Sequence, residues 1–429
     1  MTFSVEKVLF ISNAFPPRPG GGVIRPSRLA KHFFEYGWKP IVLTMVESEK
    51  TAKNGQSASL YADVVIRVPK FDMIFWLNKV LTIIKRMKTS KGSSDRETRV
   101  SEHRFSDSFM VPDIAIFWVP GAVLVGLYAV LKYRPAVIFS MSPDSSGHLV
   151  GLLLKLLTGK KWVADFRDPW ISNPFRIPKK IKFLERLDRY LEKMVVKKAD
   201  HITVTSSEYK LDFLQRYPDV CESAIKYVPN GYDPDDFSGT DMKGSKKFTV
   251  AHVGNFYGSR RSSDFLNALA ILLDKIEEQE RRSFRVLFVG ILGVEGQELV
   301  LKLGLTDVVS DLGPLPHFQA LSHIVNADLL LLIPGPGNGT MPGKVYEYLA
   351  AQKPIFCISE EGPAKRLIKE SGIGRTVSSV NVQTIALELG GFVSDIKNNT
   401  FVYPDVTSYL ETFNRKNIAK KIIEVFESV

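Results

Sequence analysis

The sequence from residue 327 to residue 359 reads Ala327-Asp-Leu-Leu-Leu-Leu-Ile-Pro334, then Gly-Pro-Gly-Asn, then Gly339-Thr-Met-Pro-Gly-Lys-Val-Tyr-Glu-Tyr-Leu-Ala-Ala-Gln-Lys-Pro354, and finally Ile355-Phe-Cys-Ile-Ser359. Its first and last runs are almost purely apolar, which predicts two buried strands. The glycines and prolines between them predict a flexible turn, and the segment after the turn predicts one short helix. Pro342 suits the first turn of this helix, where its missing N–H would have no partner.

Lys344 and Glu347 lie three residues apart, so they share one face at the start of this helix. A helix N-terminus attracts anions such as phosphate. Lys344 would add a positive charge and Glu347 would accept hydrogen bonds from a pair of hydroxyl groups. The pattern therefore favours a site for a sugar nucleotide. The alternative is a solvated ion pair, which stabilises a helix by only about 0.2–0.5 kcal/mol.

The composition is that of a globular chain with two domains. It has 429 residues, of which 45% are hydrophobic and 24% charged. The two cysteines, Cys221 and Cys357, lie far apart, which fits a reducing compartment without disulfides. No Cys/His group has the spacing of a metal site. We therefore expect no metal and no cofactor.

The net charge of +11 is unevenly distributed, because residues 1–230 carry +14 and residues 231–429 carry −3. A basic half favours nucleic acid, an anionic membrane or an anionic ligand. Nucleic acid is excluded as a partner, because no motif for it is present. The N-terminus has no signal peptide, since a strand starts at once. The uncharged run 114–131 predicts a buried helix, with a membrane-inserted helix as the alternative.

Strands and helices alternate along the chain in the βαβ pattern of a doubly wound parallel sheet, so the fold class is α/β. A turn and linker signal, Asn230-Gly-Tyr-Asp-Pro-Asp-Asp236, separates two such series. Strands are predicted at 7–12, 40–44, 63–68, 136–140, 162–165, 202–205 and 226–229, and after the linker at 248–253, 284–289, 308–311, 328–333 and 355–359. A helix is predicted at about 24–36, a mobile loop at 89–108, and an amphipathic helix at 406–429.

Four segments together resemble the glycosyltransferases of family 4, which have the GT-B fold. They are Phe15-Pro-Pro-Arg-Pro-Gly-Gly-Gly22, Val228-Pro-Asn-Gly-Tyr-Asp233, His252-Val-Gly-Asn-Phe-Tyr-Gly-Ser-Arg-Arg261 and Pro342-Gly-Lys-Val-Tyr-Glu-Tyr-Leu-Ala-Ala-Gln-Lys-Pro354. The resemblance covers nearly the whole chain. It implies two Rossmann-like domains facing across a cleft: 1–230 for the acceptor, with 409–429 packing back on it, and 231–408 for the nucleotide-sugar donor.

The resemblance also implies the reaction. It is transfer of a sugar from a nucleotide sugar to a saccharide, with retention and without a metal. The segments 142–149 and 164–170 look like a subset that makes bacterial surface polysaccharides, which implies a lipid-linked acceptor at the cytoplasmic face of the cell membrane. Two rival functions remain open: a GT-B protein that binds nucleotide sugars without transfer, and a sugar-nucleotide epimerase.

The donor site would be formed by residues of both halves. Gly20, Gly21 and Gly22 let backbone N–H groups approach a phosphate, unless they form an ordinary turn. Arg260 or Arg261 would bind the diphosphate, before a helix that Ser262 or Ser263 caps. The remaining donor residues are Thr340, Met341, Pro342, Gly343, Lys344 and Glu347. Family members often have a Glu eight residues before Glu347, where this chain has Gly339.

The proposed catalytic residues are His148, Asp168, Arg260 and Lys344. His148 would contact the donor sugar, and a packed His is the alternative. Asp165 and Asp168 follow a strand, where the ligand crevice of open α/β sheets lies. Asp168 would orient or deprotonate the acceptor hydroxyl, and an internal Asp–Arg ion pair is the alternative. The basic segments 73–88 and 176–198 would lie on anionic lipid, or be helices with a solvated face.

Overall fold

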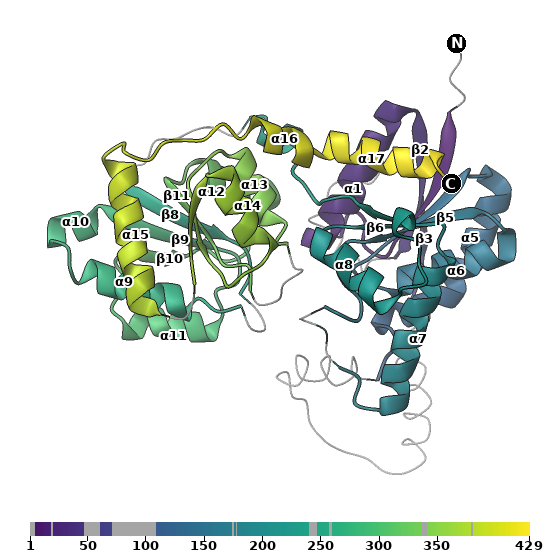
Figure 1. The fold of residues 1–429 in the computed structure, drawn as a ribbon, viewed down its shortest axis with the longest axis horizontal. Coiled ribbons are helices and arrows are strands. Elements are labelled where there is room, and N and C mark those ends of the chain that lie inside the picture. The colour runs from purple at the N-terminus through teal and green to yellow at the C-terminus, as the bar shows by residue number, and fades with distance from the viewer. Residues whose placement is uncertain are drawn as a thin grey trace, which may run out of the picture. The chain divides into compact units, whose positions relative to one another are not determined.

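A computed structural model of the chain describes residues 5–18, 20–46, 61–70, 109–173, 176, 178–239, 247–256, 260–335, 341–378 and 381–429. The chain divides into two compact units (Figure 1). Unit 1 takes in Met1–Thr205, Tyr209–Val228 and Ala419–Val429, and unit 2 takes in Ser206–Glu208 and Pro229–Ile418. The features predicted at 73–88 and 89–108 and the positions Gly339 and Thr340 lie outside the described residues.

Unit 1 is built on a parallel sheet with the strand order β3-β2-β1-β4-β5-β6-β7. Its strands are β1 (Glu6–Ser12), β2 (Trp38–Met45), β3 (Val64–Val68), β4 (Val137–Met141), β5 (Lys161–Phe166), β6 (His201–Val204) and β7 (Ile225–Tyr227). In β1 the residues Val8, Leu9, Phe10 and Ile11 are all buried, as expected for a parallel strand that is covered on both faces.

Helices cover both faces of this sheet. They are α1 (Gly21–Phe33), the 3-10 helix η1 (Phe34–Tyr36), η3 (Ile114–Trp118), α5 (Val119–Tyr133), α6 (Ser146–Thr158), α7 (Lys182–Lys198), α8 (Ser207–Arg216), η4 (Glu222–Ala224) and α17 (Arg415–Glu427). Leu9 and Ile11 point into a core with α5, α6 and α7. Phe10 points to the opposite face, where Phe33 of α1 and Phe426 of α17 pack on Phe139. The end of the chain therefore completes unit 1.

Unit 2 repeats the architecture with a parallel sheet in the order β10-β9-β8-β11-β12-β13. Its strands are β8 (Phe248–Val253), β9 (Phe284–Val289), β10 (Val309–Asp311), β11 (Leu329–Leu332), β12 (Ile355–Ile358) and β13 (Gly374–Val377). Its helices are η5 (Pro234–Phe237), α9 (Ser263–Leu273), α10 (Glu278–Arg282), α11 (Val294–Lys302), α12 (His317–Val325), α13 (Lys344–Ala350), α14 (Pro363–Ser371), α15 (Val382–Lys397) and α16 (Thr407–Phe413).

The predicted α/β fold with two parallel sheets is confirmed, and three details differ. The helix expected at about 24–36 begins earlier, so Gly21 and Gly22 are helical. The C-terminal helix is two helices, α16 and α17, which meet at Asn414. The return of the chain to unit 1 lies at Ala419, later than the predicted 409, because Phe413 of α16 still packs on Tyr346 of unit 2.

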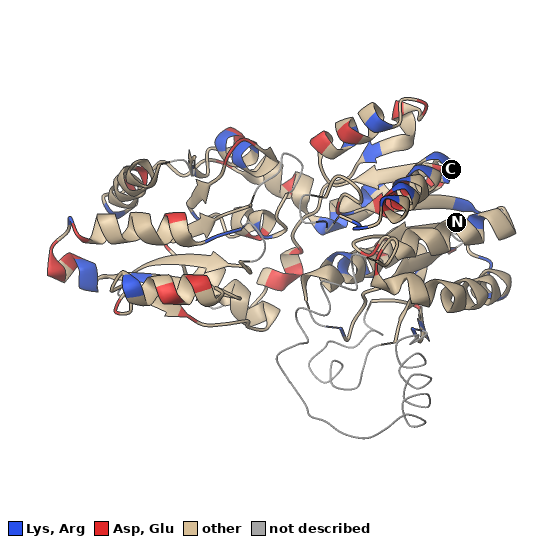
Figure 2. Cartoon of the chain, turned by 90° about the horizontal axis from the view of Figure 1, so that it is seen from below, with Lys and Arg blue, Asp and Glu red and all other residues tan. Residues whose placement is uncertain are grey.

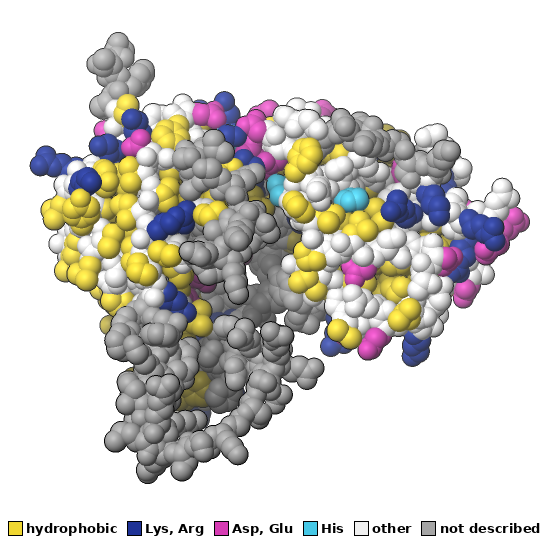
Figure 3. All heavy atoms as spheres, turned by 180° about the vertical axis from the view of Figure 1, so that it is seen from behind, with side chains coloured by type: hydrophobic (Ala, Val, Ile, Leu, Met, Phe, Trp, Pro, Cys, Tyr) yellow, Lys and Arg dark blue, Asp and Glu magenta, His cyan; other side chains and the backbone are white. Residues whose placement is uncertain are grey.

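The surface of unit 1 has an apolar area. The stretch Ile114–Tyr133 is long and apolar enough to cross a membrane, with a mean hydropathy of 2.3, but 44% of it is buried in the fold. Its inner residues, such as Ala122 and Gly126, pack in the core as predicted. Leu124, Tyr128 and Leu131 are exposed. Figure 3 shows many apolar side chains on the surface of unit 1. Figure 2 shows how the charged residues are distributed over the two units.

Candidate functional site

The sheet of unit 2 has a topological switch point at β8. This strand lies between β9 and β11. After β8 the chain adds β9 and β10 on one side of it, and it then returns to add β11 on the other side. Ligands of open α/β sheets bind at such a point, outside the carboxyl ends of the strands. Arg260 lies in the connection after β8, and Lys344 lies after β11. The guanidinium Nη2 of Arg260 donates to the carbonyl oxygen of Pro334 at 2.7 Å, so Arg260 joins the two connections.

A solvent-open pocket of about 480 Å³ lies beside Arg260 and Arg261. Its lining comprises Phe256, Arg260, Arg261, Ser262, Ser263, Leu292, Gly293, Val294, Glu295, Gly296 and Leu299. These residues include the first turns of α9 and α11. Two helix N-termini and two guanidinium groups therefore meet at one pocket, which is an environment for an anion.

Side chains fix the shape of this pocket. Arg261 is exposed, and its Nη1 lies 3.9 Å from Oε1 of Glu295. Ser262 is at the N-cap position of α9, as predicted, but its side chain makes no capping hydrogen bond. A Cβ at Gly296 would lie 2.9 Å from Oγ of Ser262, so glycine lets α11 approach this closely.

Lys344 and Glu347 contact each other directly. The distance between Nζ of Lys344 and Oε2 of Glu347 is 2.6 Å. Glu347 is only 5% exposed, which rules out the solvated pair considered from the sequence. The helix starts at Lys344, with Gly343 as N-cap, so Pro342 lies before the helix and not in its first turn. Met341 packs against the apolar core on the same side of the sheet.

His252, in the third segment that resembles family 4, is buried in β8. Its Nδ1 donates to the carbonyl oxygen of Leu331 at 3.0 Å, and its ring stacks on Phe256. Burial lowers the pKa of His252 to about 4, and the nearby charge of Arg260 acts in the same direction. The imidazole is therefore neutral at physiological pH, and the positive charge of the site is carried by the arginines and Lys344.

In unit 1 the switch point lies between β1 and β4, and the glycine segment follows β1. Gly20 has a φ of 112°, which favours glycine, and it is the N-cap of α1. Gly21 has nothing within 4 Å of an added Cβ, and at Gly22 such a Cβ would lie 3.8 Å from Nη1 of Arg167. The N-terminus of α1 therefore lies open beside the guanidinium of Arg167, as the anion-binding prediction for Gly21 and Gly22 requires.

His148 lies in the core, as in the alternative considered from the sequence. Its side chain is 0% exposed and stacks on Phe166. Its Nδ1 lies 2.9 Å from Oγ of Ser140, which also accepts the indole N–H of Trp162 at 2.8 Å. Burial lowers the pKa of His148 to about 3. The ring has no exposed surface, so the structure has the packed His of the alternative, and a contact of this side chain with a donor sugar stays a prediction.

Asp165 and Asp168 have different surroundings. Asp165 is fully buried and receives Nε and Nη2 of Arg25 at 3.1 and 3.0 Å, so it forms an internal ion pair. Its partner is Arg25 of α1 and not the adjacent Arg167. Arg167 instead lies 3.9 Å from Asp168, whose side chain is 38% exposed. Asp168 is therefore the carboxylate of this segment that a ligand can reach.

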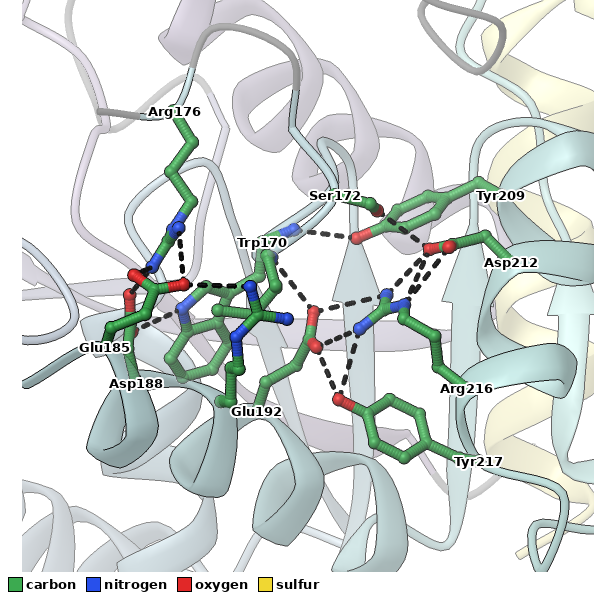
Figure 4. A network of polar contacts seen from close by, with 12 residues as sticks. Trp170, Ser172, Arg176, Glu185, Asp188, Glu192, Tyr209, Asp212, Arg216 and Tyr217 are labelled. Carbon is green, nitrogen blue, oxygen red and sulfur yellow. Dashed lines mark hydrogen bonds and ion pairs between the residues drawn. The ribbon is translucent and has the colours of Figure 1, made fainter. Parts of the chain in front are cut away.

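A polar network holds the segment that carries Asp168 (Figure 4). The hydroxyl of Tyr209 accepts the N–H of Trp170 at 2.9 Å and donates to the carbonyl oxygen of Asp168 at 3.2 Å. The indole of Trp170 donates to Asp188 at 2.8 Å, and the N–H of Ile171 donates to Glu192 at 3.1 Å. Both carboxylates belong to α7 and are 0% exposed. Helix α7 thus fixes the chain directly after Asp168.

Asn13 is a candidate that the sequence did not single out. It follows β1 at the switch point of unit 1 and is 3% exposed. Neither its amide nitrogen nor its amide oxygen has a hydrogen-bond partner among the described residues, and the same holds for Nε2 of His148. A Cβ at Gly147 would lie 2.9 Å from Oδ1 of Asn13, so Asn13 packs beside the residue that precedes His148. An Asn directly after a buried first strand is the signal that was available.

The predicted residues thus form two groups. In unit 2 the switch point gathers Met341, Pro342, Gly343, Lys344, Glu347, Arg260 and Arg261. In unit 1 it gathers Gly21, Gly22 and Asp168. Arg167 links them, because it lies beside both Gly22 and the Asp168 carboxylate. Among the described residues, no three His, Cys, Asp or Glu side chains cluster as a metal site requires.

Comparison with solved structures identifies the fold. Sucrose-phosphate synthase from Thermosynechococcus elongatus has a TM-score of 0.68 at 15% identity, over 99% of this chain and 98% of that chain. Anabaena HepE in complex with UDP-glucose has a TM-score of 0.65 at 15% identity, over 99% and 100%. S. aureus TarM, solved with UDP, has a TM-score of 0.62 at 10% identity, over 98% and 99%. These likenesses confirm the GT-B fold.

A search of curated proteins finds no match to this sequence. The family model described as Glycosyltransferase Family 4 matches residues 19–236. That range is half of the chain and includes Gly20, Gly21 and Gly22, the buried Arg25–Asp165 pair and the predicted linker 230–236. The protein is therefore a glycosyltransferase of the GT-B fold, and the chain belongs to glycosyltransferase family 4.

Proposed function

We propose that this enzyme binds a nucleotide sugar in unit 2 and transfers the sugar to a saccharide hydroxyl held by unit 1. The observation that carries the proposal is the convergence of Arg260, Arg261 and the N-termini of α9 and α11 on one pocket, which lies at the connections that follow β8 and β9. A nucleoside diphosphate is the ligand class that needs several positive groups together. Solved GT-B structures that contain UDP or UDP-glucose support this choice.

In this proposal each side chain acts on a stated part of the donor. Arg260 and Arg261 bind the diphosphate, and Lys344 moves from Glu347 to a phosphate oxygen when the donor binds. Glu347 then accepts hydrogen bonds from the ribose hydroxyls. The bond between the anomeric carbon and the diphosphate breaks, and the new bond forms to the acceptor oxygen. The three cations neutralise the departing diphosphate, so the reaction needs no metal.

Asp168 is proposed to orient or deprotonate the acceptor hydroxyl. Its carboxylate is accessible, and Tyr209 holds its backbone through the carbonyl oxygen. Arg167 lies 3.9 Å from this carboxylate, beside the open N-terminus of α1. Asn13 is proposed to add hydrogen bonds to sugar hydroxyls at the same edge of the sheet.

The acceptor is proposed to be a lipid-linked saccharide, and the anomeric configuration of the donor is proposed to be retained. Both follow from the resemblance to polysaccharide-forming members of the family. The enzyme would then work at the cytoplasmic face of the cell membrane, in the synthesis of a bacterial surface glycan. Nuclear magnetic resonance of the product tests retention, because it distinguishes the two anomers.

The donor site is tested with Lys344→Ala and with Arg260→Ala/Arg261→Ala. A charged hydrogen bond contributes about 1.5–3 kcal/mol, so we expect the UDP affinity of each variant, measured by calorimetry, to fall roughly 10- to 100-fold. Arg282→Ala is the control, because Arg282 is an exposed arginine of unit 2 on α10. Unchanged UDP affinity in both site variants would contradict the site assignment.

A second assay, which follows the consumption of nucleotide sugars, separates the rival functions. UDP-glucose is the first donor to test, followed by other nucleotide sugars, each with and without membrane extracts as a source of acceptor. Consumption of donor only with extract supports transfer. Binding without any turnover supports a binding protein, and a changed donor sugar without acceptor supports an epimerase.

A further inference from the structure

Three neighbouring helices form one outer layer of unit 1. Helix α5 packs on α6, and α6 packs on α7, all on the sheet face opposite α1 and α17. Helices α5 and α6 contain one charged residue each, Lys132 and Lys155, near their C-terminal ends. Almost the whole length of both helices is therefore apolar.

The outward side of α5 and α6 is a continuous apolar surface. On α5, Leu124 is 69% exposed, Leu131 is 75% exposed, and Tyr128 lies between them. The adjacent helix α6 exposes Leu153, Leu156 and Leu157. The spacing of four and three residues on α5 places its exposed residues on one side of the helix. Figure 3 shows apolar side chains gathered on this unit.

This surface belongs to helices that stay in the fold. The buried side of α5 is tightly packed, since a Cβ at Gly126 would lie only 2.7 Å from Cδ1 of Leu154 on α6. Asp113 links the starts of η3 and α6, because it accepts the N–H of Ala115 at 2.9 Å and the N–H of Ser146 at 3.0 Å. Helix α5 is thus suited to lie on a membrane with its outer side and not to cross it.

Helix α7 adds positive charge beside the apolar surface. Its acidic residues are buried or paired: Asp188 and Glu192 are fully buried, and Glu185 pairs with Arg176 and Arg189. The exposed charged residues of α7 are all basic, namely Lys182, Arg186, Arg189, Lys193, Lys197 and Lys198. Phe183 is 69% exposed among them, and Tyr190 is exposed as well. Aromatic and basic side chains on one helix side are typical of an interfacial membrane helix.

We propose that the layer α5–α6–α7 docks on an anionic lipid bilayer, with the leucines of α5 and α6 in the interface and the cations of α7 on the lipid headgroups. Charge complementarity selects the bilayer over a second copy of this chain. A symmetric dimer through this layer would bring two identical basic rows towards each other, whereas anionic lipid attracts them. The ammonium group of Lys132 lies 5.4 Å from the ring of Tyr128, at the edge where apolar and polar surfaces meet.

The purpose of this docking, which is to bring a lipid-linked acceptor to unit 1, rests on the proposed function. The docking itself needs no donor and no transfer, so it is measured separately. Purified full-length protein is floated with vesicles of phosphatidylcholine alone, or of two parts phosphatidylcholine and one part phosphatidylglycerol. We expect binding to the anionic vesicles that weakens as salt is added.

Two double variants test the two parts of the layer. Leu124→Ser/Leu131→Ser removes the apolar contact, and we expect at least a roughly tenfold weaker binding to the anionic vesicles. Arg186→Glu/Lys193→Glu reverses two charges of α7. Each cation removed lowers the binding constant about fivefold, so we expect a loss of more than about 25-fold.

The controls make the same chemical changes elsewhere. Leu301→Ser/Leu387→Ser alters two equally exposed leucines of unit 2, and Lys420→Glu/Lys421→Glu alters two exposed lysines of α17 on the opposite face of the unit 1 sheet. Circular dichroism melts verify that all variants are folded. The inference is overturned if the wild type ignores anionic vesicles, if layer and control variants bind alike, or if sedimentation reveals a dimer that Leu124→Ser/Leu131→Ser dissociates. Donor turnover on a water-soluble saccharide would survive any of these outcomes.

Discussion

Asn13 is buried at the end of β1, yet both polar atoms of its amide are without a hydrogen-bond partner among the described residues. A buried amide in this state costs about 1–3 kcal/mol. Asn13→Leu replaces it with an apolar side chain of similar shape. We expect unit 1 to become more stable by about 1 kcal/mol and kcat/KM for glycosyl transfer to fall. Replacing a polar residue of a substrate site by an apolar one commonly makes the protein more stable and less active.

The stability of unit 1 can be measured alone for this variant, because all five tryptophans of the chain belong to unit 1. Urea unfolding followed by tryptophan fluorescence therefore reports on unit 1. A destabilised Asn13→Leu protein with normal kcat/KM would mean that the amide is a structural residue with partners of its own.

The local sequence pattern was sufficient to predict the contacts of some residues and not those of others. Lys344 and Glu347 were predicted to share one face of a helix because they lie three residues apart, and the 2.6 Å between Nζ of Lys344 and Oε2 of Glu347 confirms that they do. The partner of Asp165 was not predictable, because Arg25 lies 140 residues away and meets it only after α1 has packed on the sheet. The burial of His148 depends in the same way on Phe166 and Ser140 of neighbouring strands.

At the scale of elements, α7 has opposite roles on its two sides. Its buried Glu192 binds Arg216, Tyr217 and the N–H of Ile171, and burial together with this carboxylate raises the pKa of the Tyr217 hydroxyl. Glu192→Ala leaves Arg216 without this buried partner. Removing one partner of a buried ion pair costs about 3–5 kcal/mol, so we expect unit 1 to lose about that much free energy of unfolding.

Urea unfolding by tryptophan fluorescence measures this loss, and Glu222→Ala is the matched control. Glu222 pairs with Lys210 at 2.8 Å on the surface of the same unit, and exposed pairs contribute little. If Glu192→Ala were no more harmful than Glu222→Ala, α7 would not be what holds the segment after Asp168.

The strands show how far elements could be predicted. All strands from β1 to β12 were predicted within about two residues, because buried parallel strands are short apolar runs. β13 was missed because its sequence Gly-Arg-Thr-Val is half polar, as an edge strand that pairs only with β12 allows. A Cβ at Gly374 would lie 1.9 Å from the carbonyl oxygen of Ile355, so its glycine reflects a close strand pairing that the sequence does not reveal.

At the scale of the whole molecule, the sequence predicted two α/β units and the uneven charge. The charge could not be assigned to a surface, because that requires knowing which side of α7 is buried. The order of the strands, and hence the two switch points, also had no local signal. It depends on how each helix crosses back over the sheet.

The chain passes between the two units at Val228–Pro229 and again at Ile418–Ala419, and these passages are joined within unit 2. The N–H of Tyr232 donates to the carbonyl oxygen of Phe413 at 3.0 Å. The N–H of Arg415 donates to the carbonyl oxygen of Tyr232 at 2.9 Å. A Cβ at Gly231 would lie 2.0 Å from the Phe413 oxygen and 2.5 Å from Cδ1 of Ile418. Only glycine allows the two passages to pair so closely.

Gly231→Ala therefore forces these passages apart, and overpacking of this kind costs about 1–3 kcal/mol. We expect the loss in unit 2, so the midpoint followed by far-ultraviolet circular dichroism falls more than the midpoint followed by tryptophan fluorescence. Gly21→Ala is the control, because it adds the same methyl group where nothing lies within 4 Å. Equal midpoints for Gly231→Ala and Gly21→Ala would contradict the close pairing. A fall confined to tryptophan fluorescence would instead place the strain in unit 1, where α17 completes the fold.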